Sequence, residues 1–264
     1  MSVVVLCSAK GSPGVTTTAL ALATSASLRS DTILVEADPS GGDLALRLGF
    51  APTPGLASLA AAGRRELNPA LVEQHCQTVV GIDIVGAPVG AAATRSALAV
   101  LGETLPSTLA AMRSRIVVCD IGRLDPGSAS LGVVKVADLI LVVVRPLLSD
   151  LGHVAEQQGE WSRLGARLAL VLSGEPGTFR RERYPASEVS DALGLEVLGT
   201  LAWDPRGVSA LMSDQHDSRR SALTHSARSL AERLARQLDG KTEDAVPGLP
   251  PRQSTGPTRI GAEL

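Results

Sequence analysis

The sequence predicts an α/β fold in which a doubly wound, mostly parallel sheet is flanked by helices. Two observations support this. Short apolar runs alternate along the chain with segments of helical periodicity, as in a sheet wrapped by helices. The runs are also continuous in Val, Ile and Leu, which is typical of strands buried on both faces. With 264 residues, of which 44% are hydrophobic, the chain can bury one substantial core.

The elements follow in order along the chain. Strands are predicted at 3–7, 32–36, 77–79 or 82–86, 115–120, 139–144, 167–172 and 197–203. Helices are predicted at 16–28, 42–48, 55–63, 69–76, 92–113, 150–164, 186–193 and 220–238. No repeat or boundary interrupts this pattern, so residues 1–240 are expected to form one domain. From Lys241 onward, prolines, few large apolar residues and no periodicity predict a disordered tail, 241–264.

Composition excludes several classes of protein. The net charge of −2 gives no global electrostatic argument for binding nucleic acid or an anionic membrane. Cys7, Cys76 and Cys119 are too few and too scattered for a disulfide framework or a zinc site, and small buried thiols in a reducing cytosol are expected instead. No apolar run reaches the ~18 residues of a membrane span, and the N-terminus lacks the pattern of a signal peptide. A cytoplasmic protein is predicted.

A glycine-containing loop, CSAKGSPGVTTT at residues 7–18, joins the first strand to an Ala/Leu helix. Backbone N–H groups of such a loop and of the helix N-terminus converge on phosphate oxygens. The pattern G-x-x-x-x-G-K-[ST] would place glycine and lysine where this chain has Ala9 and Val15. The alternative is a turn without a ligand. However, only three of the 25 basic residues are lysine, so Lys10 in the loop favours a specific role.

Two acidic positions follow the loop along the chain. Asp38, in EADPSGGD at residues 36–43, follows a strand and is placed to hold water near Mg²⁺ beside the loop. An Asp-Pro-Ser-Gly turn is the alternative. Asp120 ends the apolar run IVVCD, and an acid there can hydrogen-bond a magnesium-bound water. Gly122, two residues later, can bring its N–H toward a phosphate.

With ADLILVVVRP at 137–146 and LGTLAWDP at 198–205, these motifs resemble the MinD/ParA family in order and spacing. That family consists of P-loop NTPases of the SIMIBI class with a deviant Walker A motif, K-G-G-x-G-K-[ST]. The resemblance covers residues 1 to about 236. The chain departs from the family at Val15, which replaces the Walker lysine, and at Glu36, which replaces an aspartate. TadZ/CpaE-type relatives also have degenerate loops. Because the first strand begins at Val3, their N-terminal receiver-like domain is not expected here.

The resemblance implies ATP and Mg²⁺ as cofactors and assigns roles by motif. Lys10 and Asp38 take the catalytic positions. Thr16, Asp38 and Asp120 take the metal positions. The nucleotide-binding positions are Lys10, Gly11, Ser12, Gly14, Val15, Thr16, Thr17, Gly122 and Pro205. In the family, the residue at the Lys10 position reaches across a face-to-face homodimer to the partner's phosphates. ATP rather than GTP is implied by resemblance alone, since the guanine-reading N-K-x-D motif is absent.

The implied function is a nucleotide-dependent dimeric switch that positions a septal, polar, pilus or chromosome complex through an unidentified protein cargo or regulator. Val15 supplies no donor, and a missing charged hydrogen bond costs about 1.5–3 kcal/mol of binding. Weak or no hydrolysis is therefore expected, because positioning and charge stabilisation dominate phosphoryl transfer. Two alternatives remain: a slow Mg²⁺-dependent ATPase in which Lys10 replaces the missing lysine, and a nucleotide-free scaffold. Recruitment to a pole, septum or nucleoid would depend on a partner.

Two further segments have competing interpretations. The basic cluster Arg180–Arg183 could contact DNA phosphates non-specifically, but a solvated, partly salt-bridged loop is favoured. MinD relatives end in an amphipathic membrane helix. The helix predicted at 220–238 lacks large aromatics on its apolar face, so core packing is expected rather than direct membrane insertion.

Overall fold

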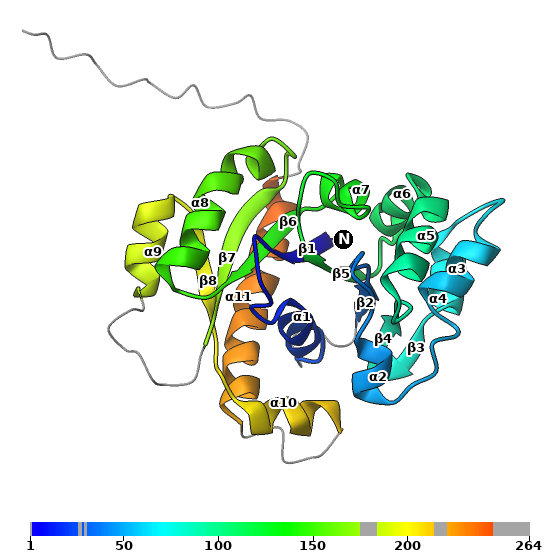
Figure 1. Cartoon of the computed structure of the whole chain (residues 1–264), viewed down its shortest axis with the longest axis horizontal. Coiled ribbons are helices and arrows are strands. Elements are labelled where there is room, and N and C mark those ends of the chain that lie inside the picture. Colours follow the sequence, from blue (N-terminus) through cyan, green and yellow to red (C-terminus); the bar gives the residue numbers. More distant parts are fainter. Residues whose placement is uncertain (1, 26–27, 29–30, 175–183, 214–220, 245–264) are drawn as a thin grey trace, which may run out of the picture.

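The computed structural model describes residues 2–25, 28, 31–174, 184–213 and 221–244, the last six without side chains. These residues contain an eight-stranded sheet in the order β3-β4-β2-β5-β1-β6-β7-β8 (Figure 1). Only β3 and β4 pair antiparallel; the other pairs are parallel. The predicted fold class is confirmed. The strands are β1 (Ser2–Ser8), β2 (Thr32–Glu36), β3 (Gln77–Val79), β4 (Ile82–Val85), β5 (Ile116–Arg123), β6 (Leu139–Val144), β7 (Arg167–Ser173) and β8 (Glu196–Leu201).

The helices form a layer on each side of this sheet. They are α1 (Val15–Ala23), α2 (Leu44–Leu48), α3 (Leu56–Ala62), α4 (Pro69–Gln74), α5 (Ala91–Leu101), α6 (Thr104–Ala111), α7 (Leu131–Lys135), α8 (Leu148–Ser162), α9 (Ala186–Leu193), α10 (Pro205–Met212) and α11 (Ala222–Asp244). Alternate β1 residues supply the two cores. Val3 and Val5 pack with α3 to α9, while Val4 and Leu6 pack with α1, α2, α10 and α11.

The central strand β1 determines where a ligand can bind. It lies between β5 and β6, with Leu6 opposite Asp120 on one side and Leu141 on the other. The chain leaves β1 through the glycine loop and α1, and returns to the sheet in β2, beyond β5. In open α/β sheets, ligands bind at the carboxyl ends of strands where the winding direction changes. The glycine loop occupies this position.

Several element boundaries differ from the sequence prediction. The helix predicted at 92–113 is two helices, because the chain turns at Gly102, which has a left-handed φ of 44°. The helix α1 ends at Ala23 rather than 28. The Thr24 and Ser25 hydroxyls donate to the carbonyls of Leu20 and Ala21, which closes the helix.

Two helices were not predicted, and a third is longer than predicted. The short α7 was missed. The strand predicted at 197–203 ends at Leu201, and α10 follows because Asp204 caps it and Pro205 occupies its first position. The helix α11 continues to Asp244, past the predicted domain boundary at 240. The rest of the predicted tail, residues 245–264, lies outside the described residues.

The structure also bears on the cysteine and membrane predictions. Cys7 and Cys119 are buried, Cys76 is half-buried, and all three are free thiols, as the sequence indicated. In the described part of the chain, no helix has the length and apolar character needed to cross a membrane. Leu223, Leu230 and Leu234 of α11 are buried in the core, which confirms the predicted packing role of this helix.

Candidate functional site

The loop between β1 and α1 has a glycine-dependent backbone. Gly11 and Gly14 have φ values of 74° and 97°, a left-handed conformation that other residues adopt at a cost. Gly14 also occupies the N-cap position of α1 and offers no capping side chain. The first N–H groups of a helix have no partner within it, so the start of α1 can accept an anion at the carboxyl edge of the sheet.

A cavity of about 390 Å³ lies along this loop. Residues from three separate segments meet there: the loop itself, the β2–α2 connection and the end of β5. They are Ser8, Gly11, Ser12, Gly14, Val15, Thr16, Thr17, Asp38, Ser40, Asp43, Arg47, Gly122 and Arg123. Most of the nucleotide positions inferred from the sequence therefore share one cavity. Lys10 is an exception, because it is exposed and lines neither cavity of the site.

Asp120 lies buried at the end of β5. The pKa of its carboxyl is raised to about 7, first by burial and also by the nearby Glu36 and Asp38, while the neighbouring Thr16 hydroxyl and the Gly122 N–H oppose the rise. The Gly122 N–H donates to Oδ1 at 3.1 Å. Among the described residues, the buried Oδ2 atom has no hydrogen-bond partner. A buried acceptor of this kind needs a cation or a water molecule.

These groups fit a Mg²⁺ ion held jointly with phosphate. The described residues contain no cluster of three or more His, Cys, Asp or Glu that could enclose a metal. Mg²⁺ does not require one, since it usually keeps several waters and takes one or two protein oxygens together with phosphates. The Thr16 hydroxyl oxygen and the Oδ2 atom of Asp120, which has no hydrogen-bond partner among the described residues, are oxygen ligands of the kind that Mg²⁺ takes. Magnesium would supply positive charge against the phosphates there.

Asp38 is fixed in a turn against Gly122. Its Oδ1 accepts from the Ser40 N–H at 2.8 Å, while the Gly41 N–H donates to its carbonyl at 3.0 Å. Gly122 has a left-handed φ of 62°, and a Cβ on it would overlap the Asp38 carboxylate. The turn interpretation and the site interpretation are thus compatible, because the turn places the carboxylate in the cavity.

Glu36 has a role that the sequence did not indicate. Its buried side chain accepts three backbone hydrogen bonds, from Asp43 at 2.6 Å and Leu44 at 3.0 Å through Oε1, and from Ala87 at 3.0 Å through Oε2. Asp43 is the N-cap residue of α2 but makes no side-chain cap, so Glu36 satisfies these N–H groups instead. Burial raises the pKa of Glu36. This glutamate ties the Asp38 segment to the chain that follows β4.

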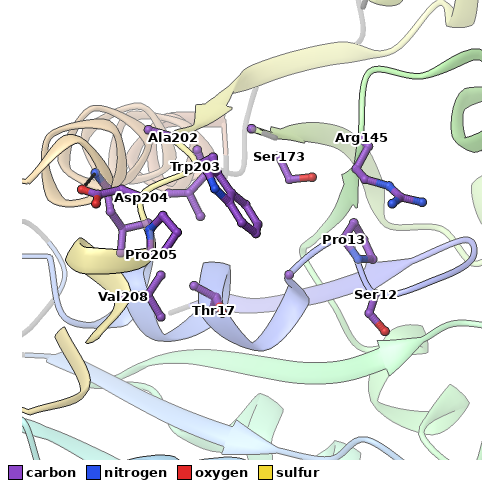
Figure 2. Close-up of a pocket in the computed structure, with 14 residues that line it drawn as sticks. Ser12, Pro13, Thr17, Arg145, Ser173, Ala202, Trp203, Asp204, Pro205 and Val208 are labelled. Carbon is purple, nitrogen blue, oxygen red and sulfur yellow. Dashed lines mark hydrogen bonds between the residues drawn. The ribbon is translucent and has the colours of Figure 1, made fainter. Parts of the chain in front are cut away.

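A second cavity, of about 490 Å³, lies on the other side of the loop (Figure 2). Ser12, Gly14 and Thr17 line both cavities, so the two adjoin at the loop. The remaining lining residues come from the loop itself, the carboxyl ends of β6, β7 and β8 with the residues just after them, α10 and α11. They are Pro13, Arg145, Ser173, Gly174, Leu201, Ala202, Trp203, Asp204, Pro205, Val208 and Leu223.

This larger cavity is mostly apolar, with one aromatic wall and one unsatisfied hydroxyl. Trp203 is 56% exposed, and its indole stands between Pro205 and Val208 on one side and Pro13 on the other (Figure 2). The buried Ser173 Oγ has no hydrogen-bond partner among the described residues. An aromatic face with a nearby polar atom suits a nucleotide base.

Pro205 and Asp204 both line this cavity, and Asp204 also has a structural role. Its carboxylate accepts from the Gly207 N–H at 2.8 Å and the Leu223 N–H at 3.3 Å, joining the starts of α10 and α11. These backbone hydrogen bonds, the one from Gly207 first, lower the pKa of Asp204 despite an opposing effect of burial. The cluster Arg180–Arg183 lies outside the described residues.

The sequence prediction missed Arg145, Ser173, Trp203 and Val208 as cavity-lining residues. One signal was available for Trp203, since aromatic residues make up only 2% of the chain and this one follows a predicted strand in a recognised motif. Arg145 also lies in a recognised motif, at 137–146, and Ser173 directly follows a predicted strand, whereas no signal in the sequence marked Val208. Their positions depend on how β6, β7 and α10 meet at the carboxyl edge of the sheet.

Several solved structures have the same arrangement of helices and strands as this chain. The MinD cell division ATPase of Pyrococcus furiosus superposes with a TM-score of 0.72 over 89% of this chain and 99% of its own, at 17% identity. MinD from Pyrococcus horikoshii complexed with Mg-ADP gives 0.72 over 91% and 98%, also at 17% identity. A ParA family ATPase from Chlorobium tepidum gives 0.69 over 88% and 98%, at 18% identity. The chain has the MinD/ParA fold.

Sequence comparison is less specific. No protein-family model matches the chain. Two uncharacterized proteins, from two strains of Mycobacterium tuberculosis, are each 29% identical to it over 251 residues. The alignment covers 91% of this chain and 66% of each relative, so the chain spans about two thirds of their length. The MinD/ParA likeness therefore establishes the fold, and activity has to be argued from the site.

Proposed function

We propose that this chain binds ATP with Mg²⁺ along its glycine loop and acts as a nucleotide-dependent dimeric switch with weak or no hydrolysis. The main support is that Ser12, Gly14 and Thr17 line both cavities, one of which is also lined by Asp38 and the other by Trp203. A nucleoside triphosphate has the same division between charged phosphates and a flat base.

Each half of the cleft would bind one part of the nucleotide. Backbone N–H groups of Gly11, Ser12 and the residues from Gly14 to Thr17 would hold the phosphates at the start of α1. Thr16 and Asp120 would hold Mg²⁺, directly and through water respectively, while Asp38 would orient water beside them. Trp203 would stack on the base, an interaction worth about 1–3 kcal/mol for aromatic residues that bind bases.

Weak turnover is proposed because of residue 15. Val15 is only 6% exposed and packs in the core on the α1 side of the sheet. It offers no charge to the transferring phosphoryl group, although charge stabilisation is most of what a protein contributes to this reaction. Lys10 is exposed on the outside of the loop, which suits contact with a second subunit better than replacement of the missing lysine.

A nucleotide-glued homodimer follows from the proposed role of Lys10. Together with the fold, it supports a role in positioning or partitioning a cellular complex at the septum, pole, pilus or chromosome. Under this proposal, a protein cargo or regulator would read the dimeric state and recruit it to a pole, septum or nucleoid. Direct membrane insertion is not proposed, because the apolar leucines of α11 are buried.

Calorimetric titration with Mg²⁺-ATP tests nucleotide binding directly. Tryptophan fluorescence provides an independent readout, since Trp203 is exposed in the cleft while Trp161 is only 4% exposed. Nucleotide should change the fluorescence of the wild type, and Trp203→Phe should remove most of that response. Absence of heat and of a fluorescence change at millimolar Mg²⁺-ATP would favour the scaffold alternative. Steady-state phosphate release separates a slow ATPase from a non-hydrolysing switch.

Sedimentation velocity tests the dimer. Mg²⁺-ATP should convert monomer to dimer, and Lys10→Ala should abolish the conversion while leaving binding by the monomer. Lys135→Ala removes an exposed lysine from α7 and is the matched control. Asp38→Ala should leave dimerisation largely intact, because its proposed partner is a water molecule. Dimers that form equally well without nucleotide, or with alanine at position 10, would overturn the nucleotide-glued mechanism.

A further inference from the structure

Arg145 stands over the glycine loop from the end of β6. It is the first residue after the strand, and it lines the larger cavity with Ser12, Pro13 and Gly14. Its Nη2 atom is 3.7 Å from the position that a Cβ on Gly11 would occupy. Figure 2 shows its guanidinium on the same side of the cavity as Ser12 and Pro13. Among the described residues lining this cavity, Arg145 is the only Lys or Arg.

The orientation of Arg145 is fixed by Asp150, in the first turn of α8. The Arg145 Nε donates to Asp150 Oδ2 at 2.5 Å, and Nη2 donates to Oδ1 at 3.2 Å. The two side chains are unequally exposed, 37% for Arg145 and 12% for Asp150. Only Arg145 lines the cavity. The ion pair therefore turns its positive end toward the loop and keeps its negative end in the protein.

Two other arginines, Arg47 and the exposed Arg123, line the smaller cavity together with Asp38 and Asp43. In the smaller cavity, Arg47 is paired at 2.6 Å with Asp43, which also lines that cavity, so this pair presents both signs of charge. Val15 is apolar where the common loop pattern has lysine. An oriented guanidinium beside Gly11 is therefore placed to meet phosphate oxygens, for which planar arginine donors are well suited.

We propose that Arg145, held by Asp150, binds the terminal phosphates of the nucleotide and replaces, from β6, the cation that is missing at position 15. Because this inference builds on the function proposed above, the two have to be separable by experiment. A phosphate-binding arginine makes a specific prediction: its effect must grow with the number of phosphates on the ligand.

The experiment is calorimetric titration of the full chain with ATP, ADP and AMP, each with Mg²⁺. Arg145→Ala should weaken ATP binding about 10- to 100-fold, ADP less, and AMP within about twofold, in line with loss of a charged hydrogen bond. Arg145→Lys should recover part of the ATP affinity. Arg167→Ala is the matched control, because it also removes an arginine paired with an acid, Glu196, at the opposite end of the sheet. It should behave as the wild type.

A second variant separates phosphate binding from repulsion by a newly exposed acid. Removing Arg145 leaves Asp150 without its partner near the phosphates. In Arg145→Ala/Asp150→Ala, repulsion is gone but the proposed contact is still missing, so ATP affinity should remain low. If the double variant binds ATP as tightly as the wild type, the proposal is wrong. Circular dichroism and thermal unfolding check the fold, and Arg145→Gln replaces any alanine variant that unfolds.

The remaining outcomes divide between the two proposals. Normal ATP binding by Arg145→Ala would overturn the role of Arg145 and leave nucleotide binding intact. An equal loss for ATP, ADP and AMP would show that Arg145 supports the loop structurally, which also overturns its phosphate role. Failure of the wild type to bind any of the three nucleotides would overturn both proposals.

Discussion

Replacing Asp120 with asparagine should stabilise the metal-free protein at neutral and alkaline pH while removing a metal-binding group. The carboxyl of Asp120 is fully buried, and its pKa is raised from 3.8 to about 7, chiefly by burial and then by Glu36 and Asp38. Asparagine has nearly the same shape and retains an oxygen that can accept from the Gly122 N–H. The substitution therefore removes an ionisable group with little change in packing.

The direction of the stability change with pH follows from how tightly each state binds the Asp120 proton. The folded protein holds the Asp120 proton more tightly than the unfolded chain does, so stability falls as pH rises from about 4 to about 7 and then levels off. At about 1.4 kcal/mol per pH unit, the full loss is on the order of 4 kcal/mol. Asp120→Asn lacks this loss. Its advantage over the wild type should grow by about 3 kcal/mol between pH 5 and pH 8.

Urea unfolding of both proteins at pH 5 and pH 8, with chelator present, measures this difference. Glu36 also titrates with a raised pKa, but it is present in both proteins, so the comparison isolates Asp120. Calorimetry should show that Asp120→Asn loses most of the Mg²⁺ dependence of ATP binding. The reasoning fails if the variant is less stable than the wild type at pH 8, or if the difference between them does not change with pH.

Three further substitutions test the loop and its supports. Val15→Lys should tighten Mg²⁺-ATP binding about 10- to 100-fold, as measured by calorimetry. Val15→Met is the control for side-chain size. Unchanged affinity in Val15→Lys would mean that the loop no longer holds phosphate. Gly122→Ala should displace Asp38, because the added Cβ would overlap its carboxylate. The left-handed φ alone should lower the free energy of unfolding by about 1–2 kcal/mol, as measured with urea. A variant with normal stability would contradict this geometry. Glu36→Asp should lose at least one of the three backbone hydrogen bonds that Glu36 accepts, which should lower the free energy of unfolding by about 1–3 kcal/mol. Faster amide hydrogen exchange at Ala87 would show that its bond to residue 36 is lost. Exchange at the wild-type rate would argue against a role of Glu36 in holding this segment.

The sheet could be predicted because its signals are local. Buried parallel strands are continuous apolar runs, and each predicted strand is present with ends shifted by a few residues. Helix ends were harder, since they depend on single backbone conformations. Gly102 breaks a pattern that is apolar at helical spacing throughout, and the helix α10 depends on a cap from Asp204. The sequence shows both residues but not the conformation each adopts.

The site was predictable only where it follows a motif. Gly11, Gly14 and Gly122 were identified from spacing, and each has the positive φ that its position requires. The contacts of Glu36 and Arg145 are different, because they join segments that meet only in the folded sheet. Glu36 reaches Ala87 across 51 positions, and Arg145 approaches the loop because β6 pairs with β1.

The distribution of charge in the cleft gives a physical reason why a site without the loop lysine can still suit a nucleotide. Glu36, Asp38 and Asp120 lie together on one side of the loop, close enough for the first two to raise the pKa of the third. Arg145 lies on the other side, with its partner Asp150 turned away from the cavity. Under the proposed function, phosphates on the loop would lie between magnesium on the acidic side and guanidinium on the opposite side. A lysine at position 15 would instead place its charge directly beside the acids. Separating the charges retains attraction for the phosphates without placing a cation directly beside Asp120, whose pKa is raised first by burial and then by Glu36 and Asp38.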